Sequence, residues 1–139
     1  MKNILNTLST INNGVYIKQS NIENAGYGLF AQRNFEKNQH ITLYDGEVLT
    51  KKEAWTRELS HMASREGVVV DGLKKPIQGR GGGSFCNSAS YQKYANAEIV
   101  AWLGYLIIKS KKYICKDEEI LVFYGRRGFK LACGLNFKQ

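Results

Sequence analysis

Two short stretches of the chain hold the residue types that could do chemistry. Residues 79–89 form a glycine-rich run that ends in the apolar Phe85 and the polar Asn87. Residues 117–125 form an acidic turn and an apolar run that closes on Tyr124 and Gly125. Glycines let a backbone approach a ligand closely, and a Tyr hydroxyl can orient a reacting group without being a strong base. The two stretches, in this order, predict one site.

A third motif, Gly26-Tyr27-Gly28, is either a tight turn or a second close approach to a ligand. It lacks the third Gly and the following helix of a dinucleotide fingerprint, which excludes a Rossmann site. The run from Arg80 to Gly83 is not followed by Gly-Lys-Ser/Thr, so a P-loop is not supported. The chain has no Gly-x-Ser-x-Gly motif and two His residues, which argues against a hydrolytic triad.

The cysteines indicate the compartment and the metal content. Cys86, Cys115 and Cys133 are widely spaced and form no Cys-x-x-Cys pair, so we expect no structural zinc and no other metal. Reduced thiols suit an intracellular protein. No apolar run approaches the ~20 residues of a membrane span, and residues 1–10 show no secretion signal.

Chain length and net charge further limit the class of protein to which the chain can belong. With 139 residues and 43% hydrophobic residues, the chain fits one globular domain spanning residues 1–139. The net charge is +8, and residues 109–139 are especially rich in Lys and Arg. This basicity predicts acidic partners such as nucleic acid, or simply a solvated basic face.

Short β-branched and aromatic runs predict a mainly β fold. They lie at residues 14–18, 28–31, 40–44, 68–70, 99–103, 104–108 and 120–124. We expect Gly104 to mark a bulge or a bend within one longer strand. Asp45 and Gly46 are expected to form a hairpin turn directly after Tyr44.

One helix is expected over residues 51–64. Thr50 is a plausible N-cap, and Glu53 stands three residues later, as in a capping box. The apolar residues of this segment have a spacing compatible with one helical face, and they are Ala54, Trp55, Leu59 and Met62. Gly67 is a reasonable stop.

Taken in order, the motifs resemble those of SET-domain protein lysine methyltransferases. They are Gly26-Tyr27-Gly28, Tyr44-Asp45-Gly46, Val70-Asp71-Gly72, residues 80–87, Asn96-Ala97, Glu118-Glu119-Ile120 and Phe123-Tyr124-Gly125. The resemblance covers residues 15–125. It implies a β-clip-like fold of several small sheets, in which the C-terminal segment is threaded in a pseudoknot-like way.

The resemblance also implies a cofactor and a set of site residues. The cofactor is S-adenosylmethionine, whose amino-acid portion Asn87 would bind. The implied cofactor-binding residues are Gly26, Tyr27, Gly28, Phe85, Cys86, Asn87, Ser88 and Tyr124. The implied catalytic residues are Tyr124, at the methyl-transfer site, and Tyr44, which would line the channel for the substrate lysine. The reacting amine must lose its proton, and an aromatic channel beside a sulfonium lowers its pKa by desolvation and like-charge repulsion.

Two departures from the family pattern refine this prediction. The usual Asn-His-Ser is here Asn87-Ser88-Ala89, which is similar to the PR-type branch. The cysteine-rich zinc segments before and after the domain are absent, as in some compact members, including small viral ones. Residues 126–139, with Phe129 and Phe137, are then expected either to close over the cofactor and lysine or to form a plain surface tail.

Three functions follow as hypotheses. The first is an intracellular methyltransferase, nuclear or chromatin-associated, that acts on a protein lysine, with histone tails favoured by analogy and nucleosomal DNA near its basic surface. The second is a catalytically silent SET-like module that binds chromatin or another protein, suggested by Ser88 and Ala89. The third is an unrelated nucleic-acid-binding domain that uses aromatic and Lys residues around positions 91–94 and 109–113.

Overall fold

The computed structural model describes residues 4–57 and 61–124, and its elements are short. They include three 3₁₀ helices (η) and one α-helix. In chain order they are η1 (Ile4–Thr7), β1 (Thr10–Ile11), β2 (Gly14–Gln19), β3 (Tyr27–Ala31), β4 (His40–Leu43), β5 (Gly46–Leu49), α1 (Lys51–Ala54), β6 (Met62–Arg65), β7 (Val68–Gly72), η2 (Gly83–Phe85), β8 (Asn87–Ser88), η3 (Gln92–Tyr94), β9 (Ala97–Trp102), β10 (Tyr105–Ser110) and β11 (Leu121–Val122).

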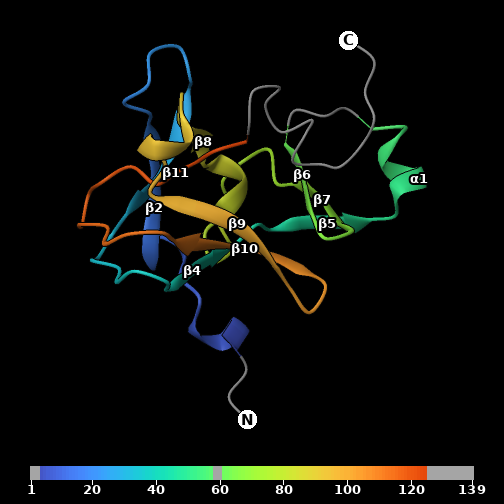
Figure 1. The fold of residues 1–139 in the computed structure, drawn as a ribbon, viewed down its shortest axis with the longest axis horizontal. Helices are drawn as coiled ribbons and strands as arrows, with labels where there is room; N and C mark the ends of the chain where they lie inside the picture. The colour runs from blue at the N-terminus through green and yellow to red at the C-terminus, as the bar shows by residue number, and fades with distance from the viewer. Residues whose placement is uncertain (1–3, 58–60, 125–139) are drawn as a thin grey trace.

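The strands of this part of the chain form four small sheets, in the orders β1-β2-β3, β4-β10-β9, β5-β7-β6 and β11-β8. In Figure 1 the sheet of β5, β6 and β7 lies with α1 at one side of the molecule, and β2 lies at the other. The core is apolar, and its fully buried members include Leu29, Phe35 and Ile108. The prediction of a mainly β fold built from several small sheets is confirmed.

Two predicted turns differ from the structure. Leu103 and Gly104 both have positive φ, at 46° and 83°, and join β9 to β10 as a two-residue hairpin. Positive φ at both positions is typical of a type I′ turn, so Gly104 is not a bulge or bend within one strand. Asp45 and Gly46 do not close a hairpin either, because β4 pairs with β10 whereas β5 pairs with β7. They form the corner at which the chain changes sheets.

The predicted helix is shorter than expected. Its start is confirmed, because the Thr50 side chain accepts from the Glu53 N–H and the Glu53 carboxylate accepts from the Thr50 N–H. The α-helix ends at Ala54, and residues 62–65 form β6, antiparallel to β7. The prediction of a helix up to residue 64 is therefore wrong, since pairing with β7 decides the state of the Met62 segment. Leu59 lies outside the described residues, as do Gly125 and residues 126–139, which were expected either to close the site or to form a plain surface tail.

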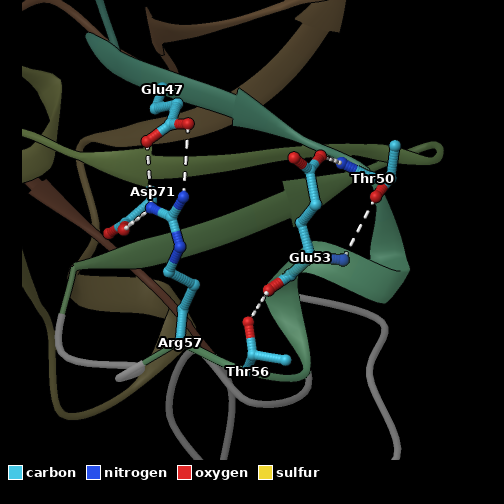
Figure 2. A network of polar contacts seen from close by, with 6 residues as sticks. All are labelled: Glu47, Thr50, Glu53, Thr56, Arg57 and Asp71. Carbon is cyan, nitrogen blue, oxygen red and sulfur yellow. Dashed lines mark hydrogen bonds and ion pairs between the residues drawn. The ribbon is translucent and has the colours of Figure 1, made fainter.

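An ionic network that is exposed at Glu47 and largely buried at Asp71 holds this small sheet to the turn after α1. Arg57 donates from Nη1 and Nη2 to the two carboxylate oxygens of Glu47, at 2.9 and 3.2 Å, and from Nη1 to Oδ2 of Asp71 at 3.1 Å. Glu47 and Asp71 are cross-strand partners on β5 and β7. Figure 2 shows the guanidinium between the two carboxylates, beside the capping box of α1.

The glycine-rich run serves close packing. A Cβ on Gly81 would lie 2.5 Å from the Leu43 carbonyl oxygen, and one on Gly83 would lie 2.7 Å from the Tyr44 Cα. No side chain fits at either position, so the loop passes directly against the end of β4. Arg80 fastens the same loop, because it forms a bidentate ion pair at 2.8 Å with Asp45 at the sheet corner. Phe85 and Asn87 are thereby brought next to Tyr44.

The last described segment passes between distant parts of the chain. On one side Ile120 donates its N–H to the Leu29 carbonyl and Glu118 accepts from the Ala31 N–H, both on β3. On the other side β11 runs parallel to β8. Asn96, buried, donates to the Glu119 carbonyl at 2.9 Å and accepts from the Leu121 N–H at 2.8 Å. This crossing places Tyr124 beside Asn87.

Candidate functional site

A cavity of about 330 Å³ opens where the glycine-rich loop, the corner after β4 and the C-terminal crossing meet. Its lining residues are Ala25, Tyr27, Tyr44, His61, Lys74, Ser84, Phe85, Cys86, Asn87, Ser88 and Tyr124. This volume is at the lower end of the usual range for small-molecule sites. The two stretches singled out in the sequence therefore meet at one cavity.

Most of the predicted site residues line this cavity. Tyr44, Tyr27 and Tyr124 do so, together with the continuous segment from Phe85 to Ser88. Gly26 and Gly28 do not line it. Gly26 has φ +74° in the turn before β3, and Gly28 lies buried on β3 behind the cavity wall.

Asn87 is held on one side by two hydrogen-bond acceptors. Its Nδ2 donates to the Tyr27 carbonyl at 3.0 Å and to Oε2 of Glu119 at 3.3 Å. An Asn amide donates only from nitrogen and accepts only at oxygen, so two acceptors at Nδ2 define which way the amide is turned.

Tyr124 is held through its backbone and its hydroxyl. Its N–H donates to Oγ of Ser88 at 3.2 Å, and its hydroxyl donates to the Cys86 carbonyl at 3.3 Å. Ser88, which stands where the family motif has His, therefore supports Tyr124. The phenol oxygen is kept at the cavity wall.

Tyr44 forms the opposite wall. Its side chain is buried, and its hydroxyl donates to the His61 carbonyl at 2.6 Å. The His61 ring lies edge-on to Phe85, with ring centroids 6.4 Å apart. The cavity is thus bordered by aromatic rings from four separate segments, which favour a cationic guest through their π faces.

Polar groups that sequence reasoning did not select complete the site. Among the described lining residues, Lys74 is the one Lys or Arg side chain, and it extends from the loop after β7. Glu119 lies behind Asn87 and is buried. Lys74 had no sequence signal, because it is one of two adjacent Lys residues in a polar loop. Glu119 stood in the motif Glu118-Glu119-Ile120, but that motif assigned it no role of its own.

Cys86 contributes its backbone to the site more than its sulfur. It is a buried free thiol. Burial, together with the nearby charge of Glu119, raises the pKa of the Cys86 thiol far above its usual value. The thiol therefore stays protonated and is a poor nucleophile, whereas its carbonyl accepts from Tyr124.

A second cavity of about 340 Å³ lies among the described residues, but its lining, which includes Asn6, Asn13 and Arg33, contains none of the predicted site residues. Within residues 4–57 and 61–124, no three His, Cys, Asp or Glu side chains gather in a way that would hold a metal ion. The helices of this same part of the chain are all too short or too polar to cross a membrane. The cavity bordered by Asn87 and Tyr124 is therefore the candidate site.

Comparison with known proteins places the chain in a family. The model of the SET domain matches residues 26–125, which is most of the chain. The protein therefore belongs to the SET-domain family, and the resemblance seen in the motifs is confirmed.

Solved structures share the fold. Polycomb repressive complex 2 of Chaetomium thermophilum, in an autoinhibited conformation bound to S-adenosylmethionine, matches 84% of this chain at 23% identity and a TM-score of 0.63. A crystal structure of the same complex matches 86% of the chain at 22% identity and a TM-score of 0.64. The chain covers only 15% and 16% of those two chains. The methyltransferase domain of human PR domain-containing protein 2 matches 86% of this chain, and 80% of its own length, at 17% identity and a TM-score of 0.60.

Proposed function

We propose that this protein is an S-adenosylmethionine-dependent protein lysine methyltransferase. The observation that carries the proposal is the meeting of Asn87, Tyr124 and Tyr44 around one aromatic cavity, within a chain of the SET-domain family. The domain spans residues 1–139 with its core at 15–125, and residues 126–139 close over the bound cofactor and lysine.

The segment from Phe85 to Ser88 would hold the methyl donor. The amino-acid portion of that donor carries an ammonium and a carboxylate, and the cavity offers a partner for each. The Asn87 amide oxygen would accept from the ammonium, and Lys74 would pair with the carboxylate. Gly26 and Gly28 shape the turn that presents the Tyr27 side chain to the donor. The donor supplies an electrophilic methyl group on its sulfonium.

The substrate lysine enters between Tyr44 and Tyr124. Desolvation between these aromatic walls and repulsion from the donor's sulfonium favour the neutral amine over the ammonium by more than the π faces favour the cation. The Tyr124 hydroxyl, anchored at the Cys86 carbonyl, orients the amine lone pair toward the methyl carbon. Alignment supplies much of the rate, and no acid–base His is needed.

Replacing Tyr124 tests this assignment. The Tyr124→Phe variant removes one hydroxyl and keeps the ring, so we expect kcat for methyl transfer to fall by about a hundredfold. The affinity for S-adenosylhomocysteine, measured by calorimetry, should stay within about twofold. Full activity in the variant would contradict the role given to the hydroxyl.

Histone tails are the favoured substrate, because the similar folds include Polycomb repressive complex 2 and a PR domain. The chain itself carries +8, so nucleosomal DNA is the expected attraction rather than the basic tail. Transfer of a tritiated methyl group onto free histones, nucleosomes and lysate proteins tests this. We expect nucleosomes to be methylated most, with a strong decrease at high salt.

A catalytically silent module is the second candidate. Ser88 and Ala89 replace the His and Ser of the usual motif, so the imidazole that borders the cofactor is missing. Calorimetry with S-adenosylmethionine separates the two: an enzyme binds it, whereas a silent module shows no heat of binding.

A further inference from the structure

We propose that Glu119 is a positioning residue: it fixes the orientation of the Asn87 amide, so that the amide oxygen is presented to the ammonium of the methyl donor. This role presupposes the proposed function, since it concerns how the same cavity selects the amino-acid end of its ligand.

Glu119 accepts hydrogen bonds from three donors in two separate segments, residues 20–21 and Asn87. Its Oε2 accepts from the Ser20 hydroxyl at 2.7 Å and from Asn87 Nδ2 at 3.3 Å. Its Oε1 accepts from the Asn21 N–H at 2.9 Å. The residue is 5% exposed, so these bonds replace water around a buried carboxylate. The carboxylate thereby joins the turn after β2 to β8.

The orientation of Asn87 follows from what lies on either side of its amide. Tyr27 and Glu119 offer two oxygens that can only accept, and both face Nδ2. Turning the amide over would place its oxygen against a carbonyl and a carboxylate, without any proton between them. The amide oxygen therefore takes the remaining direction. An acceptor there suits an ammonium, and Asn87 is one of the residues that line the cavity.

Gly28 supports this arrangement by lacking a side chain. A Cβ at this position would lie 2.3 Å from Glu119 Oε2 and 3.2 Å from Asn87 Nδ2. Because the second glycine of the Gly-x-Gly motif has no side chain, it leaves the space that the Glu119 carboxylate occupies. The motif acts on the ligand indirectly, through the carboxylate and the amide behind the cavity wall.

A carboxylate is required at position 119, and an amide of the same shape is a poor substitute. In a Glu119→Gln variant the new NH₂ group would face a donor, either the Asn21 N–H or Asn87 Nδ2. In the second case Asn87 loses one of the two acceptors at its Nδ2 and keeps only the Tyr27 carbonyl. The amide is then held less firmly in the orientation that presents its oxygen to the ammonium, and in either case the charge that strengthened these hydrogen bonds is gone.

Two ligands that differ only at the amino-acid end test the proposal. S-adenosylhomocysteine carries the ammonium and carboxylate, and 5′-methylthioadenosine lacks both. For Glu119→Gln we expect the Kd of S-adenosylhomocysteine to rise about tenfold or more, as for loss of a charge-assisted hydrogen bond. The Kd of 5′-methylthioadenosine should change by less than about twofold.

Glu118→Gln is the matched control, because it makes the same chemical change one residue away. Glu118 accepts from Asn96 Nδ2 at 3.1 Å and from the Cys115 N–H at 3.0 Å. It should leave the affinity for both ligands unchanged. Should Glu119→Gln fail to fold, Gly28→Ala replaces it, because the added Cβ displaces the carboxylate without neutralising it.

The outcomes are distinct. A selective loss of S-adenosylhomocysteine binding supports the positioning role. Equal weakening of both ligands, or no weakening of either, overturns it and reduces Glu119 to a structural residue. Failure of the wild-type protein to bind S-adenosylhomocysteine overturns the proposed function, and this role with it.

Discussion

The molecule contains two carboxylate networks with similar bonds and opposite surroundings. Glu119 is buried and collects donors from residues 32, 98 and 99 positions away. Glu47 is exposed, and its Arg57 partner lies 10 positions away. A buried carboxylate cannot exchange its partners for water, whereas an exposed one can. Two carboxylates with similar hydrogen bonds can therefore differ in how firmly they hold their partners, and burial, not hydrogen-bond geometry alone, tells them apart.

Gly28→Ala should produce the largest effect and would sharpen this contrast. The new Cβ must displace the Glu119 carboxylate, which has no solvent to move into. We expect the Kd of S-adenosylhomocysteine to rise by about tenfold or more and the protein to lose about 1–3 kcal/mol of stability. Calorimetry measures the Kd, and urea unfolding measures the stability. Gly67→Ala is a useful comparison, because that glycine has open space around it, although its positive φ costs some stability. An unchanged affinity in Gly28→Ala would contradict the claim that the Glu119 network, unlike the Glu47 network, controls ligand binding.

Asp45→Asn tests a carboxylate whose exposure lies between that of buried Glu119 and that of exposed Glu47. Burial opposes ionisation of Asp45, but the hydrogen bonds and charge of Arg80 and the Gly81 N–H outweigh it and lower the pKa of this carboxyl. A folded-state pKa below the unfolded value gives stability that is complete above about pH 4 and is lost as the pH falls through the folded-state pKa. The wild type should exceed the variant by about 2 kcal/mol in unfolding free energy at pH 7.

This difference between wild type and Asp45→Asn should shrink as the pH falls below about 4, because the carboxyl of the unfolded chain takes up its proton there while that of the folded protein, whose pKa is lowered, is still ionised. Urea unfolding at a series of pH values measures it. Glu23→Gln, at an exposed position, should show little difference from wild type at any pH. A gap between wild type and Asp45→Asn that stayed constant down to the most acidic pH would contradict a stabilising ionised pair.

Arg57→Met should give the smallest effect on ligand binding. The Arg57 side chain is 36% exposed and its Glu47 partner is 59% exposed, so solvent replaces most of what this ion pair provides, whereas Asp71 is 10% exposed and loses a partner that solvent replaces only in part. We expect a measurable decrease in the unfolding midpoint and a change in S-adenosylhomocysteine affinity of less than about twofold. A loss of affinity comparable to that of Glu119→Gln would show that the small sheet of β5, β6 and β7 governs the cavity as well.

The sequence predicted the parts of the fold that depend on local signals. The strands around Val15, Leu29 and Ile108 follow from β-branched and aromatic runs, and the capping box of Thr50 and Glu53 begins the helix as expected. The stretch at Met62 was misassigned, because its apolar spacing fits either state and a distant partner, β7, decides.

The site was predictable to a similar degree. The motifs pointed to Asn87 and Tyr124, and these residues share a cavity. The sequence could not show that Glu119 faces inward while Glu118 is exposed, because the two are identical neighbours. It also could not show that Gly28 leaves space for a carboxylate that follows much later in the chain. Such pairings exist only after the chain has crossed over itself.

The crossing of residues 117–122 between β3 and β8 also bears on when the site appears during folding. Its contacts join segments close to a hundred residues apart, which places them among the slowest to form in a small domain. The sheet of β1, β2 and β3 and the sheet of β5, β6 and β7 each pair within segments that precede Tyr124 by many residues. The cavity is therefore assembled in the last steps, and a shortened chain that ends before the crossing would keep several sheets without any place for the methyl donor.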